Sequence, residues 1–181
     1  MKKEEKVLIT YYPSDNDPMW NFEVERLIPW LKGEGADIGC GKRSIHPEII
    51  RVDIDEKVEP DIVASGDELP FLDGTLDFVY GVHAFEHFVD PRKTLTEWLR
   101  VVKVGGIVGI VHPDVNFTKK QNPEIDNPGL RDNPFNKHWH EHTQESFLAM
   151  LRSFTDLPFR IIDYGAACDH WSFYVILKKI R

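Results

Sequence analysis

Apolar and polar positions alternate along the chain with periods that predict helices and strands in turn. A first helix is predicted where Asn16 or Asp17 caps Pro18, with apolar residues at helical spacing as far as Gly33. A second helix is predicted to begin at Asp90-Pro91 and to end before Gly105-Gly106. Five short apolar runs between and after these helices predict buried strands, at residues 36–38, 49–53, 62–64, 76–82 and 107–111.

The C-terminal part of the chain continues the alternation after a long interruption. A polar, proline-rich loop is predicted over residues 113–142, and its length suggests a lid over a site. Thr143 then caps a helix that runs through Leu151. Two last strands follow at residues 159–164 and 171–177, separated by a turn at residues 165–169. Strands alternating with helices predict an α/β fold, with a mainly parallel sheet covered on both faces.

Length and composition narrow the class of protein. The 181 residues predict one domain over residues 1–181, with residues 1–33 as an N-terminal helical segment. The formal net charge of −8 argues against a broad nucleic-acid-binding surface. Two cysteines cannot form a disulfide framework, and no apolar stretch is long enough for a signal or membrane-spanning segment. We therefore expect a cytoplasmic protein without a membrane partner, and the oligomeric state stays open.

A candidate ligand site follows the first two predicted strands. Gly39 and Gly41 flank Cys40 in the turn after the first strand, where backbone must approach a ligand closely. Asp53 ends the second strand, where a carboxylate can accept the hydroxyls of a ribose, and Asp55 is the neighbouring alternative. No third glycine follows at the spacing of the dinucleotide fingerprint, which disfavours a cofactor with a pyrophosphate.

At this point the sequence resembles the class I S-adenosylmethionine-dependent methyltransferases, in particular a group of small, type 11-like enzymes. Residues 37–41 read D-I-G-C-G, residues 52–54 read V-D-I and residues 65–71 read S-G-D-E-L-P-F, in the order of the family's motifs. Residues 77–106 resemble the family's fourth strand and the helix that leads to its fifth. The resemblance implies a Rossmann-like, doubly wound sheet of seven strands in the order 3-2-1-4-5-7-6, with only the last strand antiparallel.

The resemblance also implies roles for individual residues toward S-adenosyl-L-methionine. Gly39 and Gly41 would approach the methionine end, Asp53 would hold the ribose, and Asp67 would accept a hydrogen bond from the adenine amino group. Leu69 would shape the apolar wall of the adenine pocket. The complete set of expected cofactor-binding residues is Asp37, Gly39, Cys40, Gly41, Asp53, Ile54, Asp67, Glu68 and Leu69.

Histidines lie where the methyl acceptor is expected. His83, His87 and His112 fall at or just beyond the ends of the fourth and fifth predicted strands. We expect His83 at the methyl-transfer site, as the catalytic candidate. The predicted lid supplies the expected substrate contacts, Phe135, Trp139 and His140.

Residues 83–87 also match H-x-x-E-H, the pattern of inverted zinc peptidases. A peptidase needs both histidines inside one helix, whereas this stretch straddles a strand end and a loop. Some methyltransferases that act on vicinal hydroxyls carry E-x-x-E-H here and hold a divalent ion. His83 in place of the first glutamate disfavours Mg²⁺ and favours a softer ion, which histidines of residues 138–142 could help to bind. We assign no residue as a metal ligand from the sequence.

The expected reaction is methyl transfer to a small-molecule or glycan-like acceptor, with oxygen favoured over nitrogen and carbon. The acceptor class follows from the resemblance alone, because sequences like residues 97–106 recur among proteins of polysaccharide and secondary metabolism. Two alternatives stay open: a non-catalytic S-adenosylmethionine-binding protein, and a metal-assisted methyltransferase acting on vicinal hydroxyls.

Overall fold

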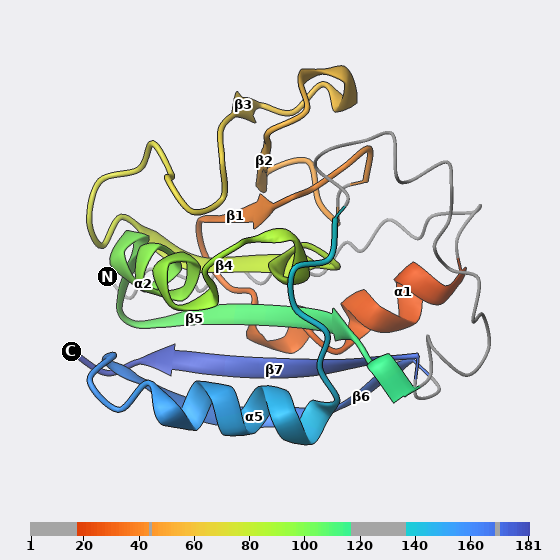
Figure 1. Cartoon of the computed structure of the whole chain (residues 1–181). Helices are drawn as coiled ribbons and strands as arrows, with labels where there is room; N and C mark the ends of the chain where they lie inside the picture. Colours follow the sequence, from red (N-terminus) through yellow and green to blue (C-terminus); the bar gives the residue numbers. More distant parts are fainter. Residues whose placement is uncertain (1–17, 44, 117–136, 169–170) are drawn as a thin grey trace.

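A computed structural model describes residues 18–43, 45–116, 137–168 and 171–181 of the chain (Figure 1). Its centre is one seven-stranded sheet in the order β3-β2-β1-β4-β5-β7-β6. β1 to β5 are parallel neighbours, and β7 runs antiparallel to both β5 and β6. The predicted strand order and the single antiparallel strand are therefore confirmed. The strands are β1 (Gly35–Ile38), β2 (Ile50–Asp53), β3 (Ile62–Val63), β4 (Leu76–Val82), β5 (Val102–Pro113), β6 (Phe159–Cys168) and β7 (Ser172–Lys179).

Helices cover both faces of the sheet, as predicted. α2 (Pro91–Val101) and α5 (Gln144–Ser153) bury Trp98, Leu95 and Phe147 in one apolar cluster with β1, β4 and β5. α1 (Pro18–Glu25) contributes Val24 to a second cluster, which includes Tyr80 of β4. The described residues also form three short 3₁₀ helices: η1 (Ile28–Trp30), η2 (Glu56–Val58) and η3 (Phe85–His87).

The predicted caps of the two longer helices are confirmed. The Asp90 side chain accepts hydrogen bonds from the backbone N–H groups of Arg92 and Lys93, ahead of Pro91 at the first helical position. Thr143 forms a capping box with Ser146 at the start of α5. These side chains fix where each helix begins, and therefore where the loops before them end.

Three predicted boundaries were wrong, each for a local reason. The first helix ends at Glu25 rather than near Gly33, because Pro29 has no N–H to donate to the carbonyl of residue 25. β5 begins at Val102 rather than at residue 107, and Gly105, with φ of 85°, lies in a bulge of this strand instead of a helix cap. Pro113 belongs to β5 and not to the predicted loop.

The turn predicted at residues 165–169 was also wrong. Gly165 and Cys168 belong to β6 and pair with Tyr174 and Ser172 of β7. A Cβ at Gly165 would lie 3.2 Å from the ring of Tyr174, so this glycine provides space for a ring and does not mark a turn. Most of the predicted lid, residues 117–136, lies outside the described residues.

The sheet reverses its winding between β1 and β4. From β1 the order runs through β2 to β3 in one direction and through β4 to β5 in the other. Ligands in open α/β sheets bind beyond the carboxyl ends of the strands at such a point. The turns after β1 and β4 therefore form the expected place for a site. In the described part of the chain no helix has both the length and the apolar character needed to cross a membrane.

Candidate functional site

Two glycines shape the turn after β1, and each is required for a different reason. Gly39 has φ of 71° and Gly41 has φ of 55°, in the left-handed region that other residues rarely adopt. A Cβ on Gly39 would lie 2.7 Å from the Cβ of Ala84, whereas a Cβ on Gly41 would meet nothing within 4 Å. Gly39 thus lets two turns touch, while Gly41 borders open space.

Asp53, at the end of β2, is bound directly to this turn. Its carboxylate accepts hydrogen bonds from the backbone N–H groups of Gly41 and Asp55, both at 2.9 Å. A carboxylate has about four acceptor positions, so positions remain for the hydroxyls of a ribose. The next residue, Ile54, is 43 % exposed and offers an apolar surface beside the carboxylate. The expected positions of both residues at the strand end are thus observed.

The Arg51 side chain also binds the turn after β1, and the sequence did not single this residue out. Its guanidinium donates to the carbonyl of Gly41 at 2.8 Å, and to the carbonyls of Val58 and Glu59 at 3.1 and 3.0 Å. It therefore joins the turn after β1 to the turn after β2. The available signal was a single basic residue inside the apolar run that predicts β2.

Asp37 and Cys40 lie beneath the turn. The Asp37 carboxyl accepts a hydrogen bond from the Tyr80 hydroxyl at 2.9 Å, and burial raises its pKa to about 7. Burial also raises the pKa of the Cys40 thiol to about 12, so this thiol is neutral. Both side chains are buried in the structure, and their geometry supports the turn from within.

Asp67, the expected adenine acceptor, is held by two hydrogen bonds. Ser65 Oγ donates to one carboxylate oxygen at 2.5 Å and Lys93 Nζ to the other at 2.8 Å. Partial burial opposes ionisation of Asp67, but these two bonds outweigh it and lower the pKa. The ionised carboxylate keeps acceptor positions for an adenine amino group. Sequence reasoning missed Lys93, which reaches this residue from the first turn of α2.

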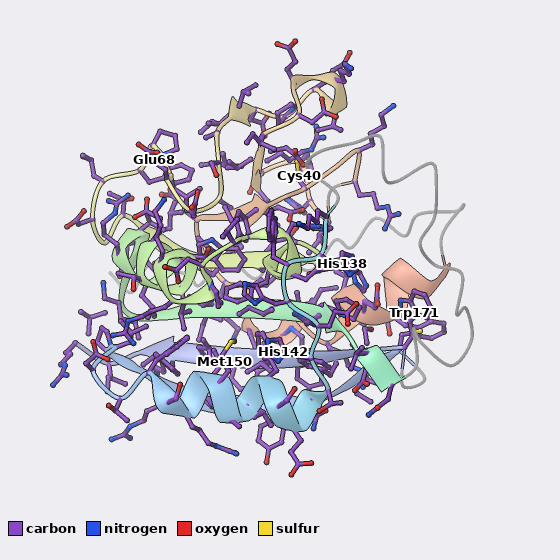
Figure 2. All side chains as sticks on the ribbon, viewed as in Figure 1. Cys40, Glu68, His138, His142, Met150 and Trp171 are labelled. Atoms are coloured by element: carbon purple, nitrogen blue, oxygen red, sulfur yellow. The ribbon has the colours of Figure 1, made fainter. Side chains whose placement is uncertain are left out.

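Residues of α2 also fix the rest of this segment. Glu97 accepts the backbone N–H of Leu69 at 2.7 Å, Arg100 donates to the carbonyl of Leu69 at 3.0 Å, and Trp98 donates to the carbonyl of Gly66 at 2.9 Å. Leu69 is buried in the core, whereas Glu68 lies on the surface of the molecule (Figure 2). The family-like motif of residues 97–106 therefore begins with residues that hold the segment of Asp67.

The turn after β4 gathers charged side chains instead of glycines. His83 has φ of 53°, a strained value for a residue with a Cβ, and its backbone N–H is bonded to the carbonyl of Val111 at 3.0 Å. His83 Nε2 is 2.7 Å from Glu23 of α1, and Nδ1 is 3.8 Å from Glu86. Burial alone would lower the pKa of His83, but the two carboxylates outweigh burial and raise it to about 10.

Sequence reasoning missed Glu23, which is buried and also accepts a hydrogen bond from Ser172 at 2.5 Å. The available signal was an acid one turn before Leu27 on the apolar face of the predicted helix. Ser172 carried no local signal, because β7 reaches this position only in the folded sheet.

Glu86 is the most buried carboxylate of this turn, at 1 % exposure. One oxygen, Oε1, faces His83 at 3.8 Å and both His87 and His138 at 3.9 Å. Burial alone would raise the pKa of Glu86, but the surrounding histidines lower it to about 2. The structure thus brings together residues that are more than fifty positions apart in the sequence.

The segment of Trp139 and His140 lies against this turn. The backbone N–H of Trp139 donates to the carbonyl of Glu86 at 2.8 Å, and His140 Nε2 bonds to the carbonyl of Val89 at 2.9 Å. The Trp139 side chain is 47 % exposed and carries the Lys137 ammonium over its ring. His138 projects from the same segment (Figure 2). Phe135, the third expected substrate contact, lies outside the described residues.

His112 belongs to the core. It is fully buried, with its ring stacked on Phe173 at 5.3 Å and tilted on Phe147 at 4.9 Å. Its Nδ1 bonds to the carbonyl of Pro113 at 2.8 Å, and burial lowers its pKa to about 4. This histidine is therefore neutral, with its proton on Nδ1.

The described residues fit an adenosyl ligand without phosphates. Open space borders Gly41, an exposed apolar side chain follows Asp53, and two ionised or bonded carboxylates have acceptor positions left. The Arg51 guanidinium beside the turn after β1 is engaged by three carbonyls and is therefore not placed to bind a phosphate. The Gly39–Ala84 contact places the turn after β1 directly beside the turn that carries His83 and Glu86.

Comparison with known proteins agrees with this geometry. Residues 36–110 match a family model described as a methyltransferase domain. An uncharacterized protein of Methanocaldococcus jannaschii is 34 % identical over 116 residues, which are 55 % of this chain and 56 % of that protein. An ajmaline N-methyltransferase of Rauvolfia serpentina is 31 % identical over 93 residues, 44 % of this chain and 31 % of the enzyme. The chain thus matches about half of one relative and a third of the other.

A similar fold occurs in solved structures. A SAM-dependent methyltransferase of Thermotoga maritima superposes with a TM-score of 0.63 at 18 % sequence identity, over 90 % of this chain and 89 % of that one. At this identity the likeness concerns the fold, and it covers nearly the whole of both chains.

Proposed function

We propose that this chain, which matches a methyltransferase-domain family over residues 36–110, is a class I S-adenosylmethionine-dependent methyltransferase and that it methylates a small-molecule or glycan-like acceptor, preferentially on oxygen. S-adenosyl-L-methionine is the cofactor of this family, and when bound it supplies a methyl group on a sulfonium for in-line displacement. The roles of this chain's own residues are then to hold the cofactor, to orient the acceptor and to exclude water.

One observation carries the proposal: the turn suited to the cofactor touches the turn that gathers the histidines. Gly39 lies against Ala84, the residue after His83. An acceptor at His83 would therefore lie next to a ligand held by Gly41 and Asp53. The proposed cofactor contacts are Gly39, Gly41, Asp53, Ile54 and Asp67. The buried side chains that would support them are Asp37, Cys40 and Leu69. The exposed Glu68 would lie at the edge of the site.

His83 suits a role in orienting the acceptor. Its Nδ1 is 3.8 Å from Glu86, beyond hydrogen-bonding distance, so this N–H is available to an acceptor atom. With a pKa of about 10, His83 keeps its proton at neutral pH. We therefore assign it to donating a hydrogen bond to the acceptor oxygen and not to removing a proton. Trp139 and His140 are the proposed contacts to the remainder of the substrate.

Nitrogen is the second candidate for the methylated atom. One relative of this chain is an ajmaline N-methyltransferase, so an amine acceptor has direct support from a similar sequence. An oxygen acceptor is favoured by the positively charged His83, because this charge stabilises a hydroxyl oxygen that loses its proton to solvent and repels an ammonium. The two acceptors also predict opposite responses to removing this charge.

The proposal is tested by binding followed by turnover. Calorimetric titration with S-adenosylmethionine and S-adenosylhomocysteine should give one site, and Asp53→Ala should weaken both ligands. Formation of S-adenosylhomocysteine is then measured with sugars, phenols and amines as acceptors. Absence of binding to either ligand would refute the proposal, and binding without turnover of any acceptor would favour a non-catalytic binding protein.

We also propose that the described residues form one domain and act in the cytoplasm. All seven strands share one sheet, which supports a single unit. Cys40 and Cys168 are free thiols and both are buried, as suits a reducing compartment.

A further inference from the structure

Glu86 and two histidines form a cluster with the composition of a metal site. The ligand atoms of Glu86, His87 and His138 all lie within 4.8 Å of one another. Glu86 Oε1 is 3.9 Å from Nε2 of each histidine, too far for hydrogen bonds. Glu86 Oε1 therefore lies close to both imidazole nitrogens without forming a hydrogen bond to either.

A second observation concerns the unpartnered oxygen of Glu86. The side chain is 1 % exposed, and within the described residues its Oε2 has no hydrogen-bond partner. A buried carboxylate with an unpartnered oxygen is costly, and such groups usually have a partner that the protein atoms alone do not supply. A cation held between Oε1 and the two histidines would offset the cost of burying this carboxylate.

A third observation concerns the tautomer of His87. Its Nδ1 lies 3.2 Å from the carbonyl of Lys137, which can only accept a hydrogen bond, so Nδ1 carries the proton. The lone pair is therefore on Nε2, the atom that faces Glu86 and His138. Metal-binding histidines characteristically donate their other N–H to a backbone carbonyl in this way.

We propose that Glu86, His87 and His138 bind a divalent first-row transition ion of the Zn²⁺ type. Two imidazoles and one carboxylate suit Zn²⁺ or Fe²⁺, whereas Mg²⁺ requires oxygen ligands. Bonds of about 2.0–2.2 Å in a tetrahedron place ligand atoms roughly 3.3–3.5 Å apart, so the two Glu86–histidine distances of 3.9 Å shorten by about half an ångström on binding. His138 is half exposed and lies on a loop segment, so it can make this movement.

The segment that carries His138 is already attached to the site. The backbone N–H of Trp139 donates to the carbonyl of Glu86 at 2.8 Å. This hydrogen bond fixes the neighbouring His138 beside the Glu86 carboxylate. Three protein ligands leave coordination positions open for water or an oxygen ligand. The inference rests on this geometry and not on the proposed methyl transfer, although metal-assisted transfer to vicinal hydroxyls would require this site.

The test uses the full chain, freed of metal with EDTA and titrated calorimetrically with ZnCl₂, CoCl₂ and MgCl₂. We expect one equivalent of Zn²⁺ to bind, Co²⁺ to give a visible absorption band of a nitrogen-ligated site, and Mg²⁺ not to bind. His138→Ala should weaken Zn²⁺ binding at least ~100-fold, more than the ~10- to 100-fold loss typical of an outer partner.

The matched control is His140→Ala, which removes an imidazole from the same segment but outside the cluster. It should leave Zn²⁺ affinity unchanged. Glu86→Gln should abolish binding, and circular dichroism checks that this buried variant folds. No stoichiometric Zn²⁺, equal binding of Mg²⁺, or equal losses in His138→Ala and His140→Ala would each overturn the proposal. S-adenosylmethionine binding, measured on the same samples, reports separately on the proposed function.

Discussion

The turn after β1 and the turn after β4 touch at Gly39 and Ala84, yet different forces hold them. In the turn after β1, positive φ angles at two glycines and backbone bonds to Asp53 and Arg51 determine the shape. In the turn after β4, His83 is held between Glu23 and Glu86 by charge. The first is a backbone-built site and the second a site built from titratable side chains.

This difference has consequences for how each side responds to change. Substitution of a glycine in the backbone-built turn changes sterics and strain, and the effect should hardly depend on pH. Substitution among titratable side chains changes charge balance, so its effect should depend on pH. The following experiments test this distinction, beginning with the largest expected effect.

Gly39→Ala should destabilise the protein most. The added Cβ would lie 2.7 Å from Ala84 and occupy a backbone with φ of 71°. Strain and overpacking together predict a loss of about 2–5 kcal/mol in the free energy of unfolding, measured by urea denaturation. The separation of the two turns should also increase, with loss of S-adenosylmethionine binding.

Gly41→Ala is the matched control, because it has a similar φ of 55° but no atom within 4 Å of the added Cβ. Its stability should fall by only about 1 kcal/mol, from strain alone. Equal destabilisation by both variants would contradict the role assigned to the Gly39–Ala84 contact. A larger loss of cofactor affinity than of stability in Gly41→Ala would place the ligand in the open space.

Asp37→Asn tests the one buried carboxyl on the backbone-built side. The folded pKa of about 7 exceeds the ordinary value of 3.8, so the neutral form is favoured and stability is lost as pH rises between these values. Wild-type stability relative to Asp37→Asn should fall by on the order of 3–4 kcal/mol between pH 4 and 8. A constant difference in urea denaturation across this range would refute the assignment.

Asp53→Asn tests the proposed ribose contact. Loss of the charge should weaken S-adenosylmethionine about 10- to 100-fold in calorimetric titration, because hydrogen bonds to a charged group are the stronger ones. Asp55→Asn is the control, since Asp55 caps η2 through the N–H of Lys57. A larger effect at Asp55 would move the ribose contact to the neighbouring residue.

Glu23→Gln should have the smallest effect, and this effect should depend on pH. The pKa of His83 is raised from 6.5 to about 10, so the stabilisation is complete below pH 6.5 and is lost as pH rises toward 10. Because His83 is partly exposed, we expect a loss of about 1 kcal/mol near pH 6.5, shrinking toward pH 10 in thermal unfolding. Ser172→Ala should keep the wild-type pH dependence, and a pH-independent Glu23→Gln effect would contradict the charge-based model.

The positions of the residues in the backbone-built site were predicted well from the sequence, because these residues lie close together along the chain. Gly39, Gly41 and Asp53 lie within fifteen positions, and the patterns that reveal strands also place these residues at strand ends. The helix caps were likewise predicted from local residue patterns, and the strand order was predicted from the family resemblance. Element boundaries were predicted wrongly where a residue type has more than one structural role. Gly165, for example, lies inside β6, where it leaves space for the ring of Tyr174, and does not form a turn.

The turn after β4 was only partly predictable, because its partners are far apart in the sequence and meet only in the folded protein. His83 and Glu86 could be singled out from their motif, but Glu23, Ser172 and His138 come from α1, β7 and the segment before α5. No local pattern shows that these side chains meet. The state of His83 as a cation also depends on neighbours from distant elements, and so could not be predicted from its own surroundings in the sequence.

The hydrogen bond from Ser172 to Glu23 joins residues 149 positions apart, and this separation bears on the order of folding. Synthesis proceeds from the N-terminus, so β1, β2 and β4 exist long before β7. β7 lies between β5 and β6, so β5 has only one neighbouring strand until residues 172–179 emerge. A nascent chain can therefore form its glycine turn early, while the contacts of the turn after β4 with β7 are the last part of the site to form.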